Sequence, residues 1–160
     1  MKSLGFIFGA VLSLSAINAQ TLNEKGLYID NNNDNTLFNG TLFNGIVSKT
    51  QEGVRSEFSV KEGVITGSAN YYYASGKLME SGFFTDGKKD QKWTRFNESG
   101  SISAIAFYAL GKKTGTWLVF DDNNKKRFEM NYENGEKIGV WTSWDENGAI
   151  ASSKNFGQVN

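Results

Sequence analysis

Carboxylates are the first side chains in this sequence that could perform chemistry. Glu98 with Asp122, or the neighbours Asp121 and Asp122, could act as the two carboxylates of a glycosidase. They fall where the pattern predicts turns, and turns favour Asp because its side chain hydrogen-bonds the local backbone. The sequence holds no histidine and no Gly-x-Ser-x-Gly motif, so a serine nucleophile lacks its usual base. We therefore predict that the protein is not an enzyme.

An asparagine-rich segment offers the next possible chemistry, which is calcium binding. Residues Asp30–Asn35 place oxygen ligands at alternate positions, as the opening of a calcium loop does. Such a loop needs Gly at its sixth position and an acid at its twelfth, where this chain has Asn35 and Thr41. The segment is better interpreted as an Asn-rich turn, and we expect no metal and no cofactor.

Lysines recur at one position of the pattern and would line one edge of the folded chain. They are Lys88, Lys89, Lys112, Lys113 and Lys137. One interpretation is a weak basic strip for an acidic protein or a phospholipid head group. The other is that lysines at sheet margins prevent edge-to-edge aggregation. The acids Asp86, Asp90 and Glu136 interleave with the lysines, which favours the protective interpretation.

A 24-residue repeat positions these side chains. Trp93, Trp117 and Trp141 recur at equal steps of 24 in residue number, and other columns keep the same step. The clearest of these are Gly87, Gly111 and Gly135, and Phe84, Tyr108, Tyr132 and Phe156. Turn residues recur at two places in each unit, for example at Asp86-Gly87 and at Ser99-Gly100. Each unit is thus predicted to contain two strands and two tight turns.

The segments between these turns have the composition of β-strands. They hold five to eight residues rich in Tyr, Phe, Trp, Val and Ile, and no long 3.6-residue periodicity occurs after the first residues. The fold class is therefore all-β, an antiparallel stack of five β-hairpins that forms an extended single sheet or solenoid-like ribbon. Alternation places Ile102, Ala104, Ala106 and Tyr108 on the core face. The tryptophan column either completes this core or forms a partly exposed stacking ladder.

Three segments carry a resemblance to a known family. Residues 72–78 hold the first part of a common pattern, which is a tyrosine, a turn Gly, Lys and an apolar residue. Residues 86–93 and 134–141 hold approximate copies of its second part, Gly-Lys-Lys-x-Gly-x-Trp. This pattern resembles the bacterial variant of the MORN repeat found in YwqK-type antitoxin proteins. It covers residues 63–156 well, with Gln91 standing where Gly115 and Gly139 stand in the later units. The resemblance implies a meandering repeat sheet used for interaction, no catalytic residues, and pairing with a toxin.

The first nineteen residues have the features of a signal peptide. Lys2 precedes an apolar run from Leu4 to Ala16, and we expect cleavage after Ala19. The run is shorter than the about 20 residues that span a membrane as a helix. The expected domains are a signal peptide at 1–19, an N-terminal polar segment at 20–39 and a MORN-like hairpin repeat domain at 40–160. The mature protein is expected to be exported, to the periplasm or the extracellular space.

Charge and composition narrow the class of partner. The formal net charge is zero, so nothing favours nucleic acid, and zero cysteines mean that disulfides cannot stabilise the exported fold. The leading hypothesis is a protein-interaction or scaffold module that binds another protein, a toxin being one candidate. Its contacts are Trp93, Trp117 and Trp141 with the neighbouring Arg95, because aromatic and Arg side chains anchor interfaces. The alternative is a cell-envelope or carbohydrate-binding module that stacks sugar rings on the same tryptophans.

Overall fold

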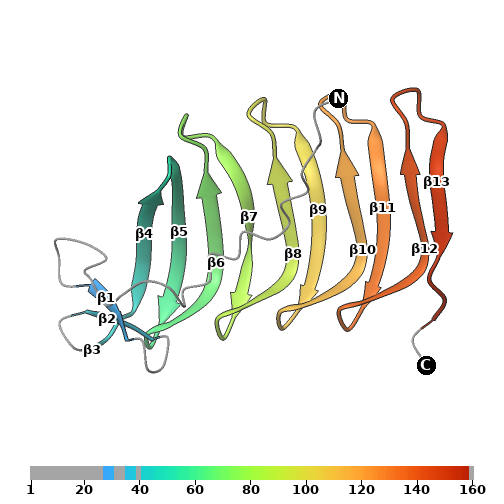
Figure 1. Cartoon of the computed structure of the whole chain (residues 1–160). Coiled ribbons are helices and arrows are strands. Elements are labelled where there is room, and N and C mark those ends of the chain that lie inside the picture. The colour runs from blue at the N-terminus through green and yellow to red at the C-terminus, as the bar shows by residue number, and fades with distance from the viewer. Residues whose placement is uncertain (1–26, 31–34, 39–40, 159–160) are drawn as a thin grey trace.

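The structure is a computed structural model that describes residues 27–30, 35–38 and 41–158 (Figure 1). The predicted signal peptide at 1–19 lies outside these residues, as do the central four residues of the asparagine-rich segment. No helix that could span a membrane occurs in the described part of the chain.

Two antiparallel sheets account for all the described strands. The small sheet has the order β1-β2-β3, and the large one has ten strands in the order β13 to β4. The strands are β1 (Leu27–Asp30), β2 (Asn35–Phe38), β3 (Thr41–Leu42), β4 (Gly45–Gln51), β5 (Val54–Lys61), β6 (Val64–Tyr72), β7 (Leu78–Thr85), β8 (Lys88–Phe96), β9 (Ile102–Ala109), β10 (Lys112–Phe120), β11 (Lys126–Glu133), β12 (Glu136–Trp144) and β13 (Ile150–Asn155). Every strand of the large sheet pairs with its sequence neighbours, which confirms the predicted all-β stack of hairpins.

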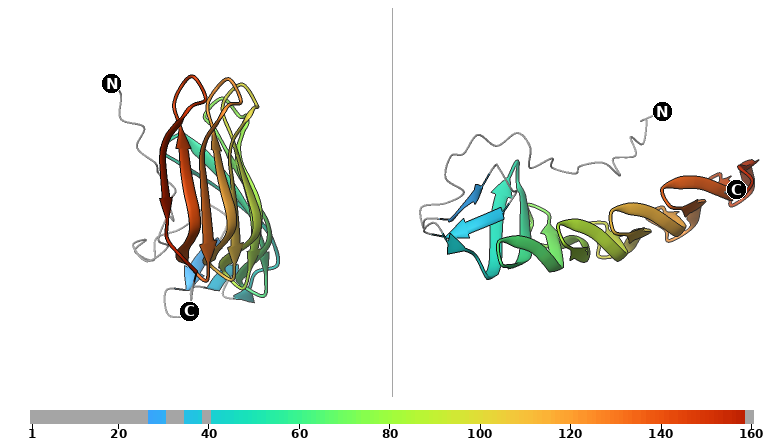
Figure 2. Two further views of the ribbon diagram at one scale, coloured as in Figure 1. Left: turned by 90° about the vertical axis from the view of Figure 1, so that its right-hand side faces the viewer. Right: turned by 90° about the horizontal axis from the view of Figure 1, so that it is seen from below.

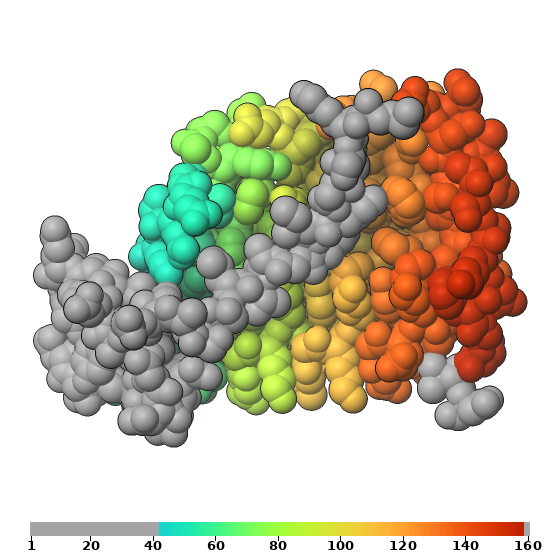
Figure 3. Space-filling model, in the orientation of Figure 1, coloured from blue at the N-terminus to red at the C-terminus, as the bar shows by residue number. Residues whose placement is uncertain are grey.

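The large sheet is one twisted layer, and its hairpins follow each other in chain order (Figures 2 and 3). Residues 24 apart lie in one row across the strands. Thr94 pairs with Ile105, and Ile105 pairs with Leu118. Leu118 pairs with Glu129, and Glu129 pairs with Thr142. Equivalent side chains of successive units are therefore two strands apart, which is about 9.6 Å.

Two-residue turns join the strands at one end of each hairpin. Asp86-Gly87, Leu110-Gly111 and Asn134-Gly135 have positive φ at both residues, the pattern of type I′ turns. Each turn glycine donates its N–H to a carbonyl of the preceding hairpin: Gly87 to Ile65 (2.8 Å), Gly111 to Lys89 (2.7 Å) and Gly135 to Lys113 (2.8 Å). These bonds lock each repeat to its neighbour.

A bulge recurs two residues before each tryptophan. Between Thr114 and Leu118, β10 has two more residues than the facing segment of β9, and β8 and β12 carry the same irregularity. The bulged residue is left-handed, with φ of 62° at Gly115, 55° at Gly139 and 59° at Gln91. Gln91 therefore occupies a conformation that favours glycine.

Replacing Gln91 with glycine is expected to raise the free energy of unfolding by about 0.5–1 kcal/mol, because relief of the left-handed strain exceeds the entropy that glycine loses on folding. Urea unfolding measures the change. Lys92→Gly is the matched control, since Lys92 is exposed and has no positive φ. It should destabilise by about 0.5–1 kcal/mol. Destabilisation by both substitutions would contradict the strain argument.

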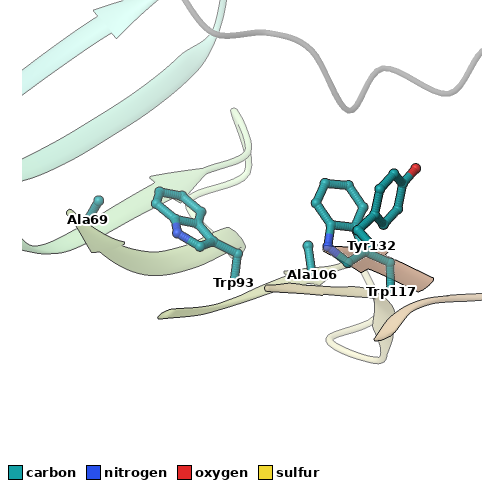
Figure 4. Packing of buried hydrophobic residues seen from close by; sticks show 5 residues of the cluster. All are labelled: Ala69, Trp93, Ala106, Trp117 and Tyr132. Atoms are coloured by element: carbon teal, nitrogen blue, oxygen red, sulfur yellow. The ribbon is translucent and has the colours of Figure 1, made fainter. Parts of the chain in front are cut away.

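The core lies on one face of the large sheet. Ala69, Trp93, Ala106, Trp117 and Tyr132 are buried together, and Figure 4 shows Trp117 beside Ala106 and Tyr132. The predicted core residues Ala104 and Ala106 are 3% and 2% exposed. Ile102 was placed in the same set and is 37% exposed, which corrects that prediction. The pairing register shifts between Arg95 and Phe96 beside the start of β9, so alternation does not carry through to Ile102.

Candidate functional site

Aromatic rings form a continuous column on the core face. Neighbouring ring centroids are 4.9–6.4 Å apart. This aromatic column consists of Phe84, Trp93, Tyr108, Trp117, Tyr132, Trp141 and Phe156. The hairpins β7–β8, β9–β10 and β11–β12 each contribute rings from both of their strands, because the 24-residue period returns the same residue types to the same row.

Two of the three tryptophans predicted as contact residues are buried in the sheet. Trp93 is 2% exposed and Trp117 is 1% exposed, so no ring face remains for a partner or for a sugar. Trp141 is half-buried. Of the two interpretations of the tryptophan column, the structure favours the core for Trp93 and Trp117.

Lysine ammonium groups cover this column. Lys89 Nζ lies 3.7 Å from the ring centroid of Trp93, Lys113 Nζ lies 4.6 Å from that of Trp117, and Lys137 Nζ lies 4.5 Å from that of Trp141. Cation–π attraction of this kind stabilises both the ring and the position of the charge. We call Lys89, Lys113 and Lys137 the lysine row.

The five lysines predicted from the sequence therefore divide into two sets. Lys88 and Lys112 each precede a member of the lysine row, so alternation along the strand turns them to the opposite face. Both are exposed. The structure brings Lys89, Lys113 and Lys137 together with the aromatic column and separates Lys88 and Lys112 from it.

One member of the lysine row is neutralised within the fold. Lys89 Nζ lies 3.1 Å from Glu80 Oε1, and the two side chains are only 21% and 19% exposed. Burial, with a further contribution from the charge of Glu80, raises the pKa of Tyr108 to about 12. Arg95 pairs with Glu80 across β7 and β8, so the predicted contact residue lies beside this acid. Glu80 was not predicted as a site residue.

The next two lysines carry no such pair. Among the described residues, the ion pairs formed do not include Lys113 or Lys137. Burial lowers the pKa of the Lys113 ammonium, and the positive charge of Lys137 lowers it further. Lys113 and Lys137, two of the three members of the lysine row, thus form a strip of positive charge without an ion-pair partner among the described residues.

Asp121 and Asp122, two of the three carboxylates considered for catalysis, form hydrogen bonds that hold the turns and connect neighbouring units. Asp121 Oδ1 accepts hydrogen bonds from the N–H groups of Asn123 and Lys125, both at 2.9 Å, and these bonds lower the pKa of Asp121, with Lys125 contributing most. Asp145 Oδ1 forms the equivalent bonds in the next unit. Asp122 accepts a bond from Asn97 Nδ2 at 3.1 Å. In the described part of the chain, no group of three potential metal ligands comes together.

Comparison with known families identifies part of the repeat. Residues 65–86 and 113–134 match the MORN repeat variant. The starting points of the two matches are separated by two periods of the repeat. No curated protein matches the chain. MORN repeats generally act as modules for interaction with proteins or membranes, and the family is in general non-catalytic.

Proposed function

We propose that this MORN-repeat chain is an exported, non-catalytic module that binds another protein through the face bearing the lysine row. The observation that carries this function is the pair of ammonium groups on Lys113 and Lys137, which are held over aromatic rings and lack a carboxylate partner among the described residues. Side chains fixed in this way lose little conformational freedom on binding. Such a surface is pre-organised for an acidic partner.

The burial of Trp93 and Trp117 argues against the carbohydrate alternative, because sugar stacking needs an exposed ring face. The zero net charge gives no support to a general affinity for nucleic acid. The YwqK-type resemblance makes a toxin one class of protein partner. Because export is also proposed, that toxin would act outside the cytoplasm.

Partner capture tests this function. The mature protein is immobilised, and proteins of the cell envelope and culture medium of its own source are passed over it. We expect wild type to retain a protein that the double variant Lys113→Gln/Lys137→Gln loses. The matched control is Lys88→Gln/Lys112→Gln, which removes the same charge from the opposite face and should retain the partner. Equal retention by all three proteins would contradict the proposed surface.

Export predicts a defined N-terminus. Expression of the full chain in a secretion-competent bacterium should give a mature protein that begins at Gln20, measured by intact mass and N-terminal sequencing. Ala19→Arg is expected to block cleavage, because signal peptidase requires a small residue there. Recovery of wild type that begins at Met1 in the cytosolic fraction would contradict export and leave the repeat fold unaffected.

A further inference from the structure

The Glu80–Lys89 pair shows how a carboxylate engages the lysine row. Glu80 stands on β7, the strand next to β8, and its Oε1 lies 3.1 Å from Lys89 Nζ while the ammonium remains over the Trp93 ring. One lysine thus contacts a ring and a carboxylate together. The fold contains its own example of an occupied position.

The equivalent positions of the next two units hold no acid. Addition of 24 and 48 to Glu80 gives Ala104 and Phe128. Consequently neither Lys113 nor Lys137 has an internal carboxylate in the place that Glu80 fills for Lys89. A carboxylate from another molecule can reach these ammonium groups from solvent, since Lys137 is exposed and Lys113 is half-buried.

The spacing of these two lysines limits the shape of the partner. Lys113 and Lys137 are equivalent residues on β10 and β12, two strands apart, so the repeat separates them by about 9.6 Å. A polyproline II segment rises about 3.1 Å per residue with three residues per turn, which places every third side chain on one face at about 9.3 Å. A β-strand repeats on one face at about 6.8 Å and does not match this spacing.

We propose that Lys113 and Lys137 bind an acidic segment of a partner protein that lies across the strands as a polyproline II helix, with carboxylates at every third residue. This inference rests on the proposed protein-binding function and specifies the partner. Charge complementarity identifies the occupant, because the two ammonium groups face solvent without a carboxylate of their own. Burial lowers the pKa of the Lys113 ammonium and the charge of Lys137 lowers it further, so bound carboxylates would supply the counter-charge that this position lacks.

Peptides provide the test. The probe Glu-Pro-Pro-Glu-Pro-Pro-Glu holds carboxylates at the required spacing in a preformed polyproline II helix. The control peptide Pro-Pro-Glu-Glu-Glu-Pro-Pro has the same composition with adjacent acids. Titration calorimetry at low salt with the intact mature protein should show binding of the probe that is about tenfold tighter than that of the control peptide.

Variants separate this site from unspecific charge attraction. Lys113→Gln/Lys137→Gln should weaken probe binding about tenfold, whereas Lys88→Gln/Lys112→Gln should change it less than about twofold. Glu80→Gln should release Lys89, provide a third ammonium group for the third carboxylate, and tighten binding about threefold. Circular dichroism of each variant verifies that the sheet is intact.

Three outcomes would overturn the inference. Equal affinity for the probe and the control peptide would show that spacing is not recognised. Absence of peptide binding together with lysine-dependent binding to phosphatidylserine vesicles would assign the strip to membrane head groups. If a captured protein depends on Lys113 and Lys137 but neither peptide binds, the proposed function stands and the polyproline II segment is excluded.

Discussion

Replacing Trp117 with alanine is expected to lower the free energy of unfolding by about 3–5 kcal/mol, the usual loss when a buried aromatic side chain is truncated. The Trp117 side chain is 1% exposed. Its ring centroid lies 5.1 Å from that of Tyr108 and 5.0 Å from that of Tyr132, so the substitution interrupts the aromatic column at its centre. Urea unfolding followed by circular dichroism measures the loss.

Trp117→Phe is the matched control, because it keeps an aromatic ring and removes the indole N–H. That group donates to the carbonyl of Phe107 at 3.0 Å, so its loss should cost about 1–3 kcal/mol. Trp141→Ala should cost less than Trp117→Ala, since Trp141 is only half-buried. A loss below about 1 kcal/mol for Trp117→Ala would show that the column is not a core.

The fold could be predicted from the sequence because its determinants are local. A type I′ turn needs two residues at positive φ, and residue pairs such as Asn134-Gly135 predict this turn from the sequence. Alternation then assigns one face of each strand. The constant length of the repeat unit places the strands of successive units beside each other, so the period that appears in the sequence is also the period of the sheet.

The contacts between the lysine ammonium groups and the tryptophan rings could not be predicted from the sequence. Lys113 and Trp117 are four residues apart, and in a regular strand four residues span about 13 Å. The Lys113 ammonium nevertheless lies 4.6 Å from the Trp117 ring centroid, with the left-handed bulge at Gly115 between them. Alternation predicts which face a side chain occupies, but it does not predict the shortening that a bulge introduces.

The sequence did not identify Glu80 as a site residue for a different reason. A repeat analysis draws attention to residues that recur, and Glu80 is replaced by Ala104 and Phe128 in the following units. The available signal was the departure itself, a charged residue in a column that is otherwise uncharged and lies on the core face. Functional differences between repeats are expected at such departures, because the recurring positions are already needed for the fold.

Gly82 is a second position at which one unit differs from the others, because the following units have Ala106 and Met130 there. It makes room for the Trp93 ring, which takes a different orientation beside Ala69. The 24-residue step places Ala69 where later units have tryptophan, and Figure 4 shows the Trp93 ring directed toward Ala69. A Cβ atom built on Gly82 would lie 2.2 Å from the Trp93 ring. Within the described residues, the buried Trp93 Nε1 has no hydrogen-bond partner, whereas Trp141 Nε1 donates to a backbone carbonyl at 2.9 Å.

Gly82→Ala is therefore expected to destabilise the protein by about 1–3 kcal/mol, the cost of overpacking a well-filled core. The result is diagnostic because alanine normally stabilises a strand relative to glycine by about 0.5–1 kcal/mol. Gly82 has no positive φ, so the backbone itself accepts alanine. Urea unfolding should show that Gly82→Ala costs less free energy of unfolding in a Trp93→Phe background than in the wild type, because the smaller ring leaves space for the added methyl group. Among the described residues, Trp93 Nε1 has no hydrogen-bond partner, so Trp93→Phe loses no indole hydrogen bond. Additive losses in the double variant would mean that Gly82 and Trp93 do not share this space.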